Sequence, residues 1–424
     1  MTISENSRNI TPKEAYVWIW LPNETKPVVA GRIERSGEQL LFNYGQSYLN
    51  RSYSIPIYLP ELPLEKGILI PRNGLNMASS LRDAAPDAWG RRVILNRLFG
   101  YKGINVDTSE LHEMTYLVVS NSDRFGALDF QLSPSEYVPR ENQTAPIEEL
   151  LSAVEKVEKG IPLTPDLDQA LFHGTSLGGA RPKAMIEDEN TKMIAKFSSS
   201  TDTFNIVKAE FVAMRMAARV GLDVAPVHLQ YVAGKDVLLV ERFDRVKMKN
   251  EWTRKAVVSA LTLFGLDEML ARYASYEELA EIIRHRFTAP KKTLKEVFGR
   301  LVFNILCGNT DDHARNHASF WNGEHLTLTP AFDICPQARA GNTASQAMLI
   351  VGNNRSSTLA TCLATAPNFL LNNQEAKGII DEQISLIQEN LEEICNEAAL
   401  TEVDRNLFQQ RFFLNDFIFE GYDG

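Results

Sequence analysis

The chain has 424 residues and a formal net charge of -10, and its 44% apolar and 23% charged residues are typical of a globular protein. The length predicts two or three domains and excludes a collagen, a disordered chain or a small disulfide scaffold. The acidic balance makes bare DNA a poor primary partner.

Cysteine spacing and hydropathy indicate a reducing compartment and no membrane. The four cysteines lie far apart and form no CxxC pair, which argues against a zinc site and against secretion. No apolar run reaches the ~20 residues of a membrane helix, and the polar segment Met1–Thr11 lacks the apolar core of a signal peptide. We therefore expect a cytoplasmic protein without a membrane partner.

Residues 1–135 are expected to form a β-rich N-terminal subdomain. Aromatic and apolar runs predict four strands, at Tyr16–Leu21, Val28–Ile33, Gln39–Tyr44 and Ala127–Leu132. A helix is predicted over Ala88–Phe99, because Asp87 can cap its start and Gly100 can end it. The polar stretch Ser133–Pro146 is the candidate linker.

Residues 136–243 are expected to form a small mixed lobe. Apolar periodicity predicts a helix over Ile147–Val157 and another that ends at Gly221. Polar turns separate two predicted hairpins, whose strands are Lys183–Ile186 with Met193–Phe197 and Val227–Val232 with Val237–Val240.

Residues 244–424 are expected to form a large helical lobe. Its main predicted helices are Thr293–Cys307, Gln374–Ala398 and Glu402–Phe419. Between them, two short apolar stretches around Asn322-Gly323 predict a hairpin. The three regions together predict an α+β fold.

The segment Gly308–His317 presents a polar cluster at the end of a buried helix. Asp311 and Asn316 have the D-x-x-x-x-N spacing of kinase catalytic loops, in which the Asp receives the substrate hydroxyl proton and the Asn binds a metal ion. Asp333 follows the predicted hairpin, where kinases place a second metal ligand. One amide and one carboxylate suit Mg²⁺, which shares its remaining ligands with phosphates.

Two other interpretations of this segment stay open. Asp-Asp-His and Asn-His are common in turns, and the spacing occurs by chance in long chains. His313 and His317 could instead bind zinc, although the HExxH glutamate is absent.

Features upstream favour the kinase interpretation. Gly178 and Gly179 lie in a loop of small residues where backbone N–H groups could approach phosphate oxygens, and Lys183 adds positive charge. Lys196 lies between apolar residues of the next strand, and Glu210 on the following helix is its candidate partner. An ordinary surface turn and an edge-strand lysine facing water are the alternatives.

A strand then leaves the small lobe at Leu238–Arg245, where a nucleotide hinge is expected. The order of glycine loop, strand Lys, helix Glu, hinge, D-x-x-x-x-N and Asp is that of a bilobal kinase.

Four stretches closely resemble those of HipA-like serine/threonine kinases, the toxin halves of HipA/HipB toxin–antitoxin modules. They are Ser176–Ala184, Val240–Arg245, Asn309–Phe320 and Leu328–Asp333. Leu81–Asp87 and Asp123–Leu128 are similar to N-terminal segments of the same family. The resemblance implies a bilobal protein-kinase-like fold, with a β-rich N-terminal subdomain and a helical C-terminal lobe.

The resemblance also implies an activity and partners. The protein would use ATP and Mg²⁺ to phosphorylate a protein, for which an aminoacyl-tRNA synthetase is one candidate. It would bind a HipB-like helix-turn-helix antitoxin and reach DNA only through that antitoxin. A small-molecule kinase on the same scaffold and a non-catalytic module of a toxin–antitoxin or DNA complex are the alternatives.

Carried over by residue, the resemblance makes Asp311 the catalytic base and Asn316 and Asp333 the Mg²⁺ ligands. The nucleotide-binding candidates are Ser176, Gly178, Gly179, Lys183, Lys196, Glu210, Glu241 and Phe243, with Glu241 and Phe243 at the adenine hinge. Ser176 matches a loop serine that is autophosphorylated. Asp312 departs from the family, because the best-known members have Gly there, and Arg181-Pro182 also departs in the loop.

One basic cluster could touch nucleic-acid phosphates. It consists of Arg91, Arg92 and Arg97 on one predicted helix. Such residues are more often the solvated face of a helix.

Overall fold

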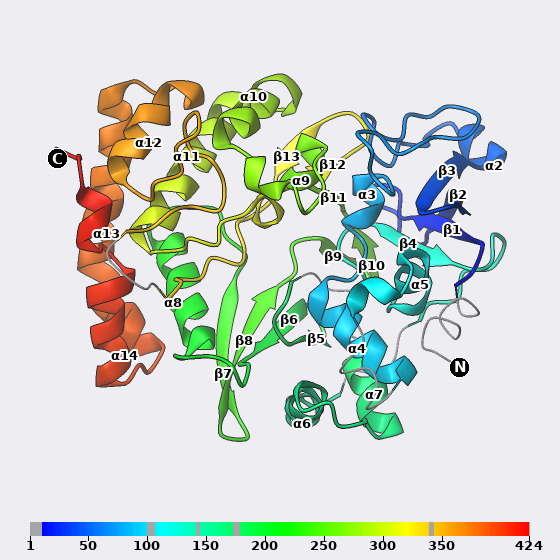
Figure 1. Ribbon diagram of the computed structural model, residues 1–424, viewed down its shortest axis with the longest axis horizontal. Helices are drawn as coiled ribbons and strands as arrows, with labels where there is room; N and C mark the ends of the chain where they lie inside the picture. Colours follow the sequence, from blue (N-terminus) through cyan, green and yellow to red (C-terminus); the bar gives the residue numbers. More distant parts are fainter. Residues whose placement is uncertain (1–10, 100–106, 141–144, 173–178, 339–342, 424) are drawn as a thin grey trace. The chain divides into compact units, whose positions relative to one another are not determined.

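The computed structural model describes residues 11–99, 107–140, 145–172, 179–338 and 343–423 (Figure 1). It divides into two compact units. The first contains Met1–Thr201, Tyr231–Val258 and Trp321–Glu324, and the second contains Asp202–Gln230, Ser259–Phe320 and His325–Gly424. Both helices and strands are abundant, which confirms the predicted α+β class.

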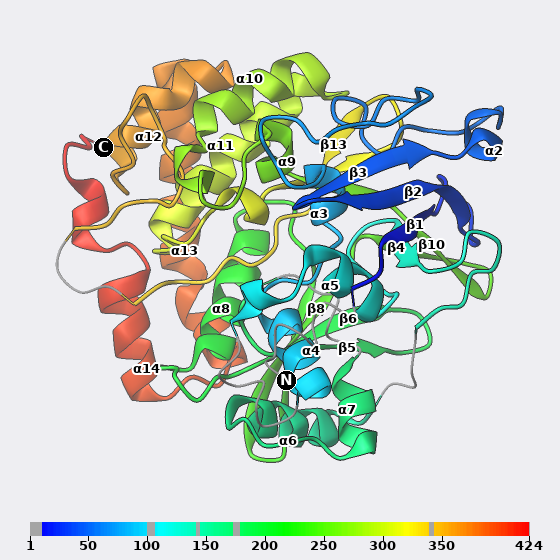
Figure 2. The same cartoon turned by 45° about the vertical axis from the view of Figure 1, so that its right-hand side comes forward.

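The first unit begins with a four-stranded antiparallel sheet of order β3-β2-β1-β4. Its strands are β1 (Glu14–Ile19), β2 (Val28–Ser36), β3 (Gln39–Tyr44) and β4 (Leu128–Gln131), so all four predicted strands form. Figure 2 shows β1, β2 and β3 side by side. Alternate side chains such as Val17, Ile33 and Phe42 are buried together, which is why the period-2 pattern was visible in the sequence.

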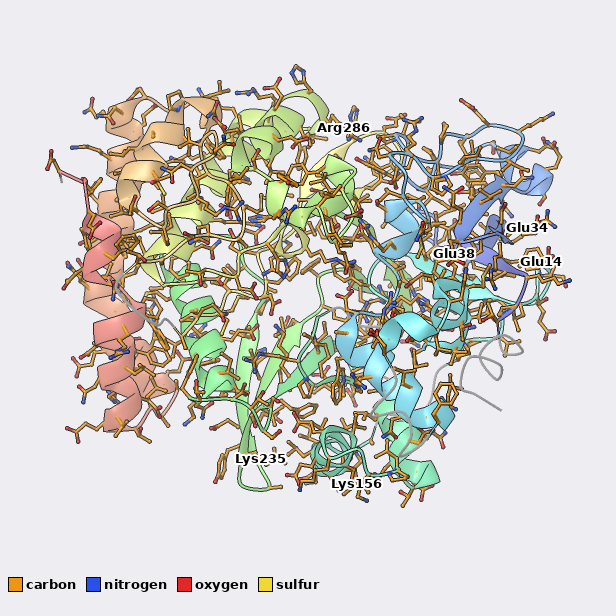
Figure 3. All side chains as sticks on the ribbon, viewed as in Figure 1. Glu14, Glu34, Glu38, Lys156, Lys235 and Arg286 are labelled. Carbon is orange, nitrogen blue, oxygen red and sulfur yellow. The ribbon has the colours of Figure 1, made fainter. Side chains whose placement is uncertain are left out.

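Like charges that oppose each other in this sheet are neutralised locally. Glu14 and Glu34 are directly opposed cross-strand partners, and Figure 3 shows both at the same end of the sheet. Arg32 binds both carboxylates, at 2.8 Å and 3.0 Å respectively. A cation between two carboxylates removes the repulsion that such a pair would suffer.

Helices interrupt the expected β-rich subdomain. The longest is α4 (Ala88–Phe99), which has the predicted bounds. Shorter helices are α2 (Gln46–Leu49), α3 (Ser79–Arg82), η2 (Thr108–Glu110) and α5 (Glu113–Val119).

A second four-stranded sheet has the order β5-β6-β8-β7. Its strands are β5 (Lys183–Glu187), β6 (Lys192–Phe197), β7 (Val227–Val232) and β8 (Lys235–Glu241). Ala184, Ala195 and Leu239 on one face of this sheet pack in a core with α6 (Ile147–Glu158) and α7 (Pro165–Phe172). An ion pair joins Lys235 in the β7–β8 turn region to Glu155 of α6, beside the labelled Lys156 (Figure 3).

Strands β9 (Arg245–Met248) and β10 (Glu251–Arg254) form a hairpin in the first unit. Strand β11 (Ala256–Ser259) then ends where the chain enters the second unit.

Helices dominate the second unit. The early ones are α8 (Ile206–Arg219), α9 (Ala260–Phe264), η3 (Ala271–Tyr273), α10 (Tyr276–Arg286) and α11 (Pro290–Leu306). After η4 (Ala314–Asn316), β12 (Ala318–Trp321) pairs with β13 (Leu326–Leu328) as the predicted hairpin. Then come α12 (Leu359–Thr365), η5 (Ala366–Phe369) and α13 (Asn373–Glu397).

Two of these helices are tied together by ion pairs. Helices α8 and α13 lie side by side (Figure 1), and Arg215 and Arg219 of α8 each approach a glutamate of α13 within 3.0 Å. Helix α11 is the centre of the unit, because every residue from 297 to 306 is buried. A helix that is buried all round is a core helix.

The predicted continuous helix Glu402–Phe419 is wrong. Helix α14 (Glu402–Leu407) passes into a π turn, η6 (Phe408–Phe412), and a separate 3-10 turn, η7 (Asp416–Phe419), follows. Leu414 has a φ of 53°, and its N–H bonds to the Leu306 carbonyl at 2.8 Å. The turn at Leu414 thus ends the helical path, and Phe412 and Phe413 before it are both buried.

Among the described helices, none is long and apolar enough to cross a bilayer.

Candidate functional site

The polar cluster begins where α11 ends, and a glycine makes the turn. Gly308 has a φ of 74°, and a Cβ on it would lie 2.9 Å from the Phe412 carbonyl oxygen. The turn therefore needs a residue without a side chain. Asn309 next returns to the helix: its backbone N–H bonds to Asn304 O at 2.8 Å, and its side-chain amide bonds to Asn304 Oδ1 at 3.0 Å.

The D-x-x-x-x-N loop folds back on itself. The N–H of His313 bonds to Asp311 O at 2.9 Å, and the N–H of Asn316 bonds to His313 O at 2.8 Å. The Asn316 side chain donates from Nδ2 to Asp311 O at 3.2 Å. Because the amide nitrogen is used in this way, Asn316 Oδ1 faces away from the Asp311 carbonyl and can accept a cation. Asp311 itself is exposed.

Asp312 and His317, which directly follow the two motif residues, meet in the interior. His317 Nε2 lies 2.9 Å from Asp312 Oδ1, and the Tyr276 hydroxyl donates to Asp312 Oδ2. Burial alone would raise the pKa of Asp312, but His317 and the Tyr276 hydroxyl outweigh it and hold that pKa below its ordinary value. Burial, followed by the Asp312 charge, raises the pKa of Tyr276 well above its usual range. The carboxylate is thus the form that this network favours.

The segment that carries Asp333 is anchored by backbone bonds. Ala331 forms a parallel bridge with Val224, and Arg300 of α11 donates to Thr329 O at 3.0 Å. Asp333 itself has a φ of 60°, in the left-handed region. Such a conformation costs of order 1 kcal/mol or more in a residue other than glycine and concentrates at functional sites.

The N-terminus of α4 holds the end of the expected glycine loop. Ser176 and Gly178 lie outside the described residues. Gly179 donates its N–H to Asp87 Oδ2 at 2.6 Å and accepts from the N–H of Trp89 at 3.3 Å. Trp89 Nε1 also donates to Lys183 O at 3.1 Å. Both ends of the segment 179–183 are therefore fixed.

Lys183 and Lys196 are directly opposed cross-strand partners in β5 and β6. Directly opposed side chains share one face of the sheet, and like charges there repel each other. Gly179 lies so close that a Cβ would be 2.3 Å from Lys183 Nζ. Two positively charged side chains therefore lie on one face of the sheet, and that of Lys183 is buried beside Gly179.

The predicted partner of Lys196 belongs to another part of the molecule. Glu210 is buried on α8 in the second unit, whereas Lys196 lies in the first. The Lys196–Glu210 pair stays a prediction.

The expected hinge is held by a buried charge network that the sequence analysis missed. The Phe243 ring packs edge-to-face on Phe125 at 5.7 Å, and Glu241 ends β8 as the partner of Met193. Arg242 and Arg245 bind both Asp123 and Asp244, at 2.7 to 3.0 Å. The sequence signal was that Asp123–Leu128 and Val240–Arg245 both resemble segments of the same family.

These ion pairs control the ionisation of the buried acids. Burial by itself raises the pKa of Asp123, but Arg242 and Arg245 outweigh it and hold that pKa well below its usual range. The pKa of Asp244 is lowered against burial by the same two guanidinium groups. The hinge segment is therefore bound to the turn at Asp123–Gly126, where Gly126 N–H also donates to Asp244 Oδ2 at 2.8 Å.

The chemistry of two residues fits Mg²⁺. Asn316 Oδ1 and the Asp333 carboxylate are hard oxygen atoms of the kind that Mg²⁺ prefers. Among the described residues, no group of three or more His, Cys, Asp and Glu could hold a metal ion, so a cation at Asn316 and Asp333 would complete its shell with phosphates and water. The zinc alternative loses support because His317 Nε2 already contacts Asp312.

The basic cluster on α4 is engaged within the first unit. Arg91 binds Glu113 at 2.5 Å and lies over the Tyr116 ring, and Arg97 contacts Asp168 at 3.2 Å. These contacts favour a structural role over phosphate binding.

Comparison with known proteins agrees with the sequence patterns. The family model of the HipA-like C-terminal domain matches residues 175–391, about half of the chain. The putative kinase Y4mE of Sinorhizobium fredii is 27% identical over 151 residues, which are 33% of either protein. The serine/threonine-protein kinase toxin HipA of Shewanella oneidensis is 24% identical over 184 residues, 38% of this chain and 42% of that protein. The alignments thus span less than half of these two curated relatives.

A solved structure is similar over nearly the whole chain. It is a chain from the Shewanella oneidensis MR-1 complex of HipA, HipB and operator DNA, with a TM-score of 0.71 at 17% identity and 93% coverage of both chains. At this identity the likeness concerns the fold, and it confirms the HipA kinase-like fold expected from the motifs.

Proposed function

Because the chain belongs to the HipA-like C-terminal domain family, we propose that it is a kinase that uses ATP and Mg²⁺ to phosphorylate a serine or threonine of a protein. The observation that carries the proposal is the closed D-x-x-x-x-N loop, in which Asn316 binds the Asp311 carbonyl while Asp311 stays exposed. An exposed carboxylate at this position can reach an acceptor hydroxyl. The kinase names of the curated relatives support the same conclusion.

Each group then has a role. Asp311 accepts the proton of the acceptor hydroxyl while the hydroxyl oxygen forms a bond to the γ-phosphorus of ATP. The bond between the γ-phosphorus and the β–γ bridging oxygen breaks, and that oxygen leaves with ADP. Lys183 and Lys196 bind phosphate oxygens, and Glu210 would orient Lys196. Asn316 and Asp333 would hold Mg²⁺, which neutralises phosphate charge when bound. Glu241 and Phe243 would border the adenine.

We also propose an organisation and a means of regulation. Residues 136–243 would form the nucleotide lobe and residues 244–424 the catalytic lobe, after an N-terminal subdomain over 1–135. Ser176, two positions before Gly178 in the sequence, would accept a phosphoryl group from the same ATP. The added negative charge would repel ATP and inactivate the enzyme.

The partners follow from the same family. A HipB-like antitoxin would bind this chain, and DNA would be contacted only through that antitoxin. The similar fold of a chain from a complex of HipA, HipB and operator DNA supports such a partner. An aminoacyl-tRNA synthetase is one candidate for the protein that is phosphorylated.

Labelled ATP tests the activity. Wild type, Asp311→Asn, Asp333→Asn and the exposed-surface control Glu382→Gln are incubated with Mg²⁺ and labelled ATP, and phosphopeptides are sequenced. We expect label on Ser176 in wild type and the control, and a loss of about 100-fold or more in the two Asp variants, the range of general acid–base catalysis. Equal labelling of all four proteins would refute the proposal. Label on added hydroxylated metabolites alone would favour a small-molecule kinase.

A further inference from the structure

Asp312 and His317 are the direct neighbours of the two motif residues in the catalytic loop. Asp312 follows Asp311 directly, and His317 follows Asn316 directly. The contact of 2.9 Å between His317 Nε2 and Asp312 Oδ1 therefore closes the base of the loop that carries both motif residues. The exposed fractions of the two side chains are only 3% and 4%, so water does not compete for this contact.

Two helices hold the pair in place. Tyr276, the first residue of α10, is fully buried, and its hydroxyl donates to Asp312 Oδ2. The same hydroxyl lies 3.3 Å from His317 Nε2, and the Tyr276 ring meets the imidazole edge-to-face at 5.4 Å. Asn304 of α11 bonds to Tyr276 and, through its amide oxygen, to Asn309 at the start of the loop. The base of the loop is thus attached to α11, in which every residue from 297 to 306 is buried.

We infer that Asp312, His317 and Tyr276 act as a positioning clamp that fixes Asp311 and Asn316 for phosphoryl transfer. The inference rests on the proposed kinase function. None of the three clamp side chains touches the reactants in this scheme, because all three are buried below the loop. They act through their neighbours: the clamp holds Asp311 toward the acceptor and Asn316 Oδ1 toward the cation.

The chemistry of the pair allows a rescue test. In the wild type, His317 Nε2 must carry a proton to donate to the Asp312 carboxylate, which can only accept. With an asparagine at 312, the imidazole can hold its proton on Nδ1, which has no hydrogen-bond partner among the described residues, and leave Nε2 as an acceptor. An asparagine at 312 could then donate to Nε2 and still accept from the Tyr276 hydroxyl. Asp312→Asn should therefore keep the clamp, whereas Asp312→Ala should open it.

The experiment compares Asp312→Ala, Asp312→Asn and Tyr276→Phe with a matched control, Thr365→Val. Thr365 is buried in the same unit and bonds to Ile350 O at 3.0 Å, so the control loses a buried hydrogen bond that involves none of the clamp residues. For each protein, kcat and KM for ATP, the Mg²⁺ concentration that half-saturates binding of a non-hydrolysable ATP analogue, and the melting temperature are measured.

A positioning role predicts that kcat falls while KM for ATP hardly changes, a pattern that a loss of stability alone would not produce. In Asp312→Ala we expect kcat to fall by about 10- to 100-fold, because a displacement of about 1 Å can cost that much. KM for ATP should stay within twofold, and half-saturation should need several times more Mg²⁺. Asp312→Asn should keep kcat within about threefold of wild type. Thr365→Val should lower only the melting temperature.

Other outcomes overturn the inference. The inference fails if Asp312→Ala folds and has the kcat of the wild type. It also fails if kcat of Asp312→Asn falls as far as that of Asp312→Ala. If Asp312→Ala does not fold, Tyr276→Phe decides, because it removes only a hydroxyl: an unchanged kcat and Mg²⁺ requirement would refute the clamp. If the clamp variants behave like wild type but Asp311→Asn is inactive, the clamp is refuted and the kinase proposal stays intact. An active Asp311→Asn would refute the proposed function itself.

Discussion

Replacing Gly179 with alanine should weaken nucleotide binding far more than it weakens folding. Gly179 has a φ of 95°, and a Cβ there would lie 2.3 Å from Lys183 Nζ. Ordinary van der Waals contact begins near 3.4 Å, so the Lys183 ammonium must move by about 1 Å. Lysine is flexible, and this movement costs little in the absence of nucleotide.

The expected magnitudes come from two separate effects. Alanine in a left-handed conformation costs about 1–2 kcal/mol, which lowers the melting temperature of a domain of this size by roughly 2–8 °C. Displacing Lys183 removes a charged hydrogen bond to a phosphate, worth about 1.5–3 kcal/mol. That loss corresponds to an ATP affinity weaker by roughly 10- to 100-fold.

Gly234→Ala is the matched control. Gly234 lies in the β7–β8 turn and has a φ of 80°, but nothing lies within 4 Å of the position of its Cβ. Both variants should therefore lose similar stability in thermal denaturation without nucleotide. In calorimetric titration with ATP, only Gly179→Ala should bind weakly. Equal ATP affinities for the two variants would refute the placement of Lys183 in the nucleotide site.

Two further predictions concern stability. Gly308→Ala would place a Cβ 2.9 Å from the Phe412 carbonyl oxygen at a φ of 74°, whereas the control Gly352→Ala has a φ of 53° and open space around its Cβ. In urea denaturation, Gly308→Ala should lose at least about 2 kcal/mol more of the free energy of unfolding than Gly352→Ala. Equal losses would contradict this prediction. The pKa of Asp123 is lower in the folded state than its value of roughly 3.9 in the unfolded state, so the ionised carboxylate adds to the free energy of unfolding at any pH above about 3.9. This contribution is lost as the pH falls from about 3.9 through the lower folded pKa. Urea denaturation from pH 7 to 3 should thus show a steep loss below about pH 4 that is smaller in Asp123→Asn; identical profiles would refute it.

Local signals explain which elements could be predicted. Helix α4 has its predicted bounds, and the signals that predicted them, Asp87 and Gly100, are local features of the sequence. Strand β3 was visible because its burial alternates residue by residue. The C-terminal helix was mispredicted because Leu414 bonds to Leu306, a partner 108 positions away that no local pattern reveals.

The sequence by itself determined the family, the α+β class and the order of the candidate site residues. The Asp311–Asn316 loop belongs to this group, because its closing bonds run between neighbours in the chain. Which charges meet was decided only by the tertiary structure. Register places Lys183 opposite Lys196, and folding brings Tyr276 to Asp312 and Arg242 to Asp123, 36 and 119 positions apart. Burial makes these contacts strong, and burial is a property of the assembled fold.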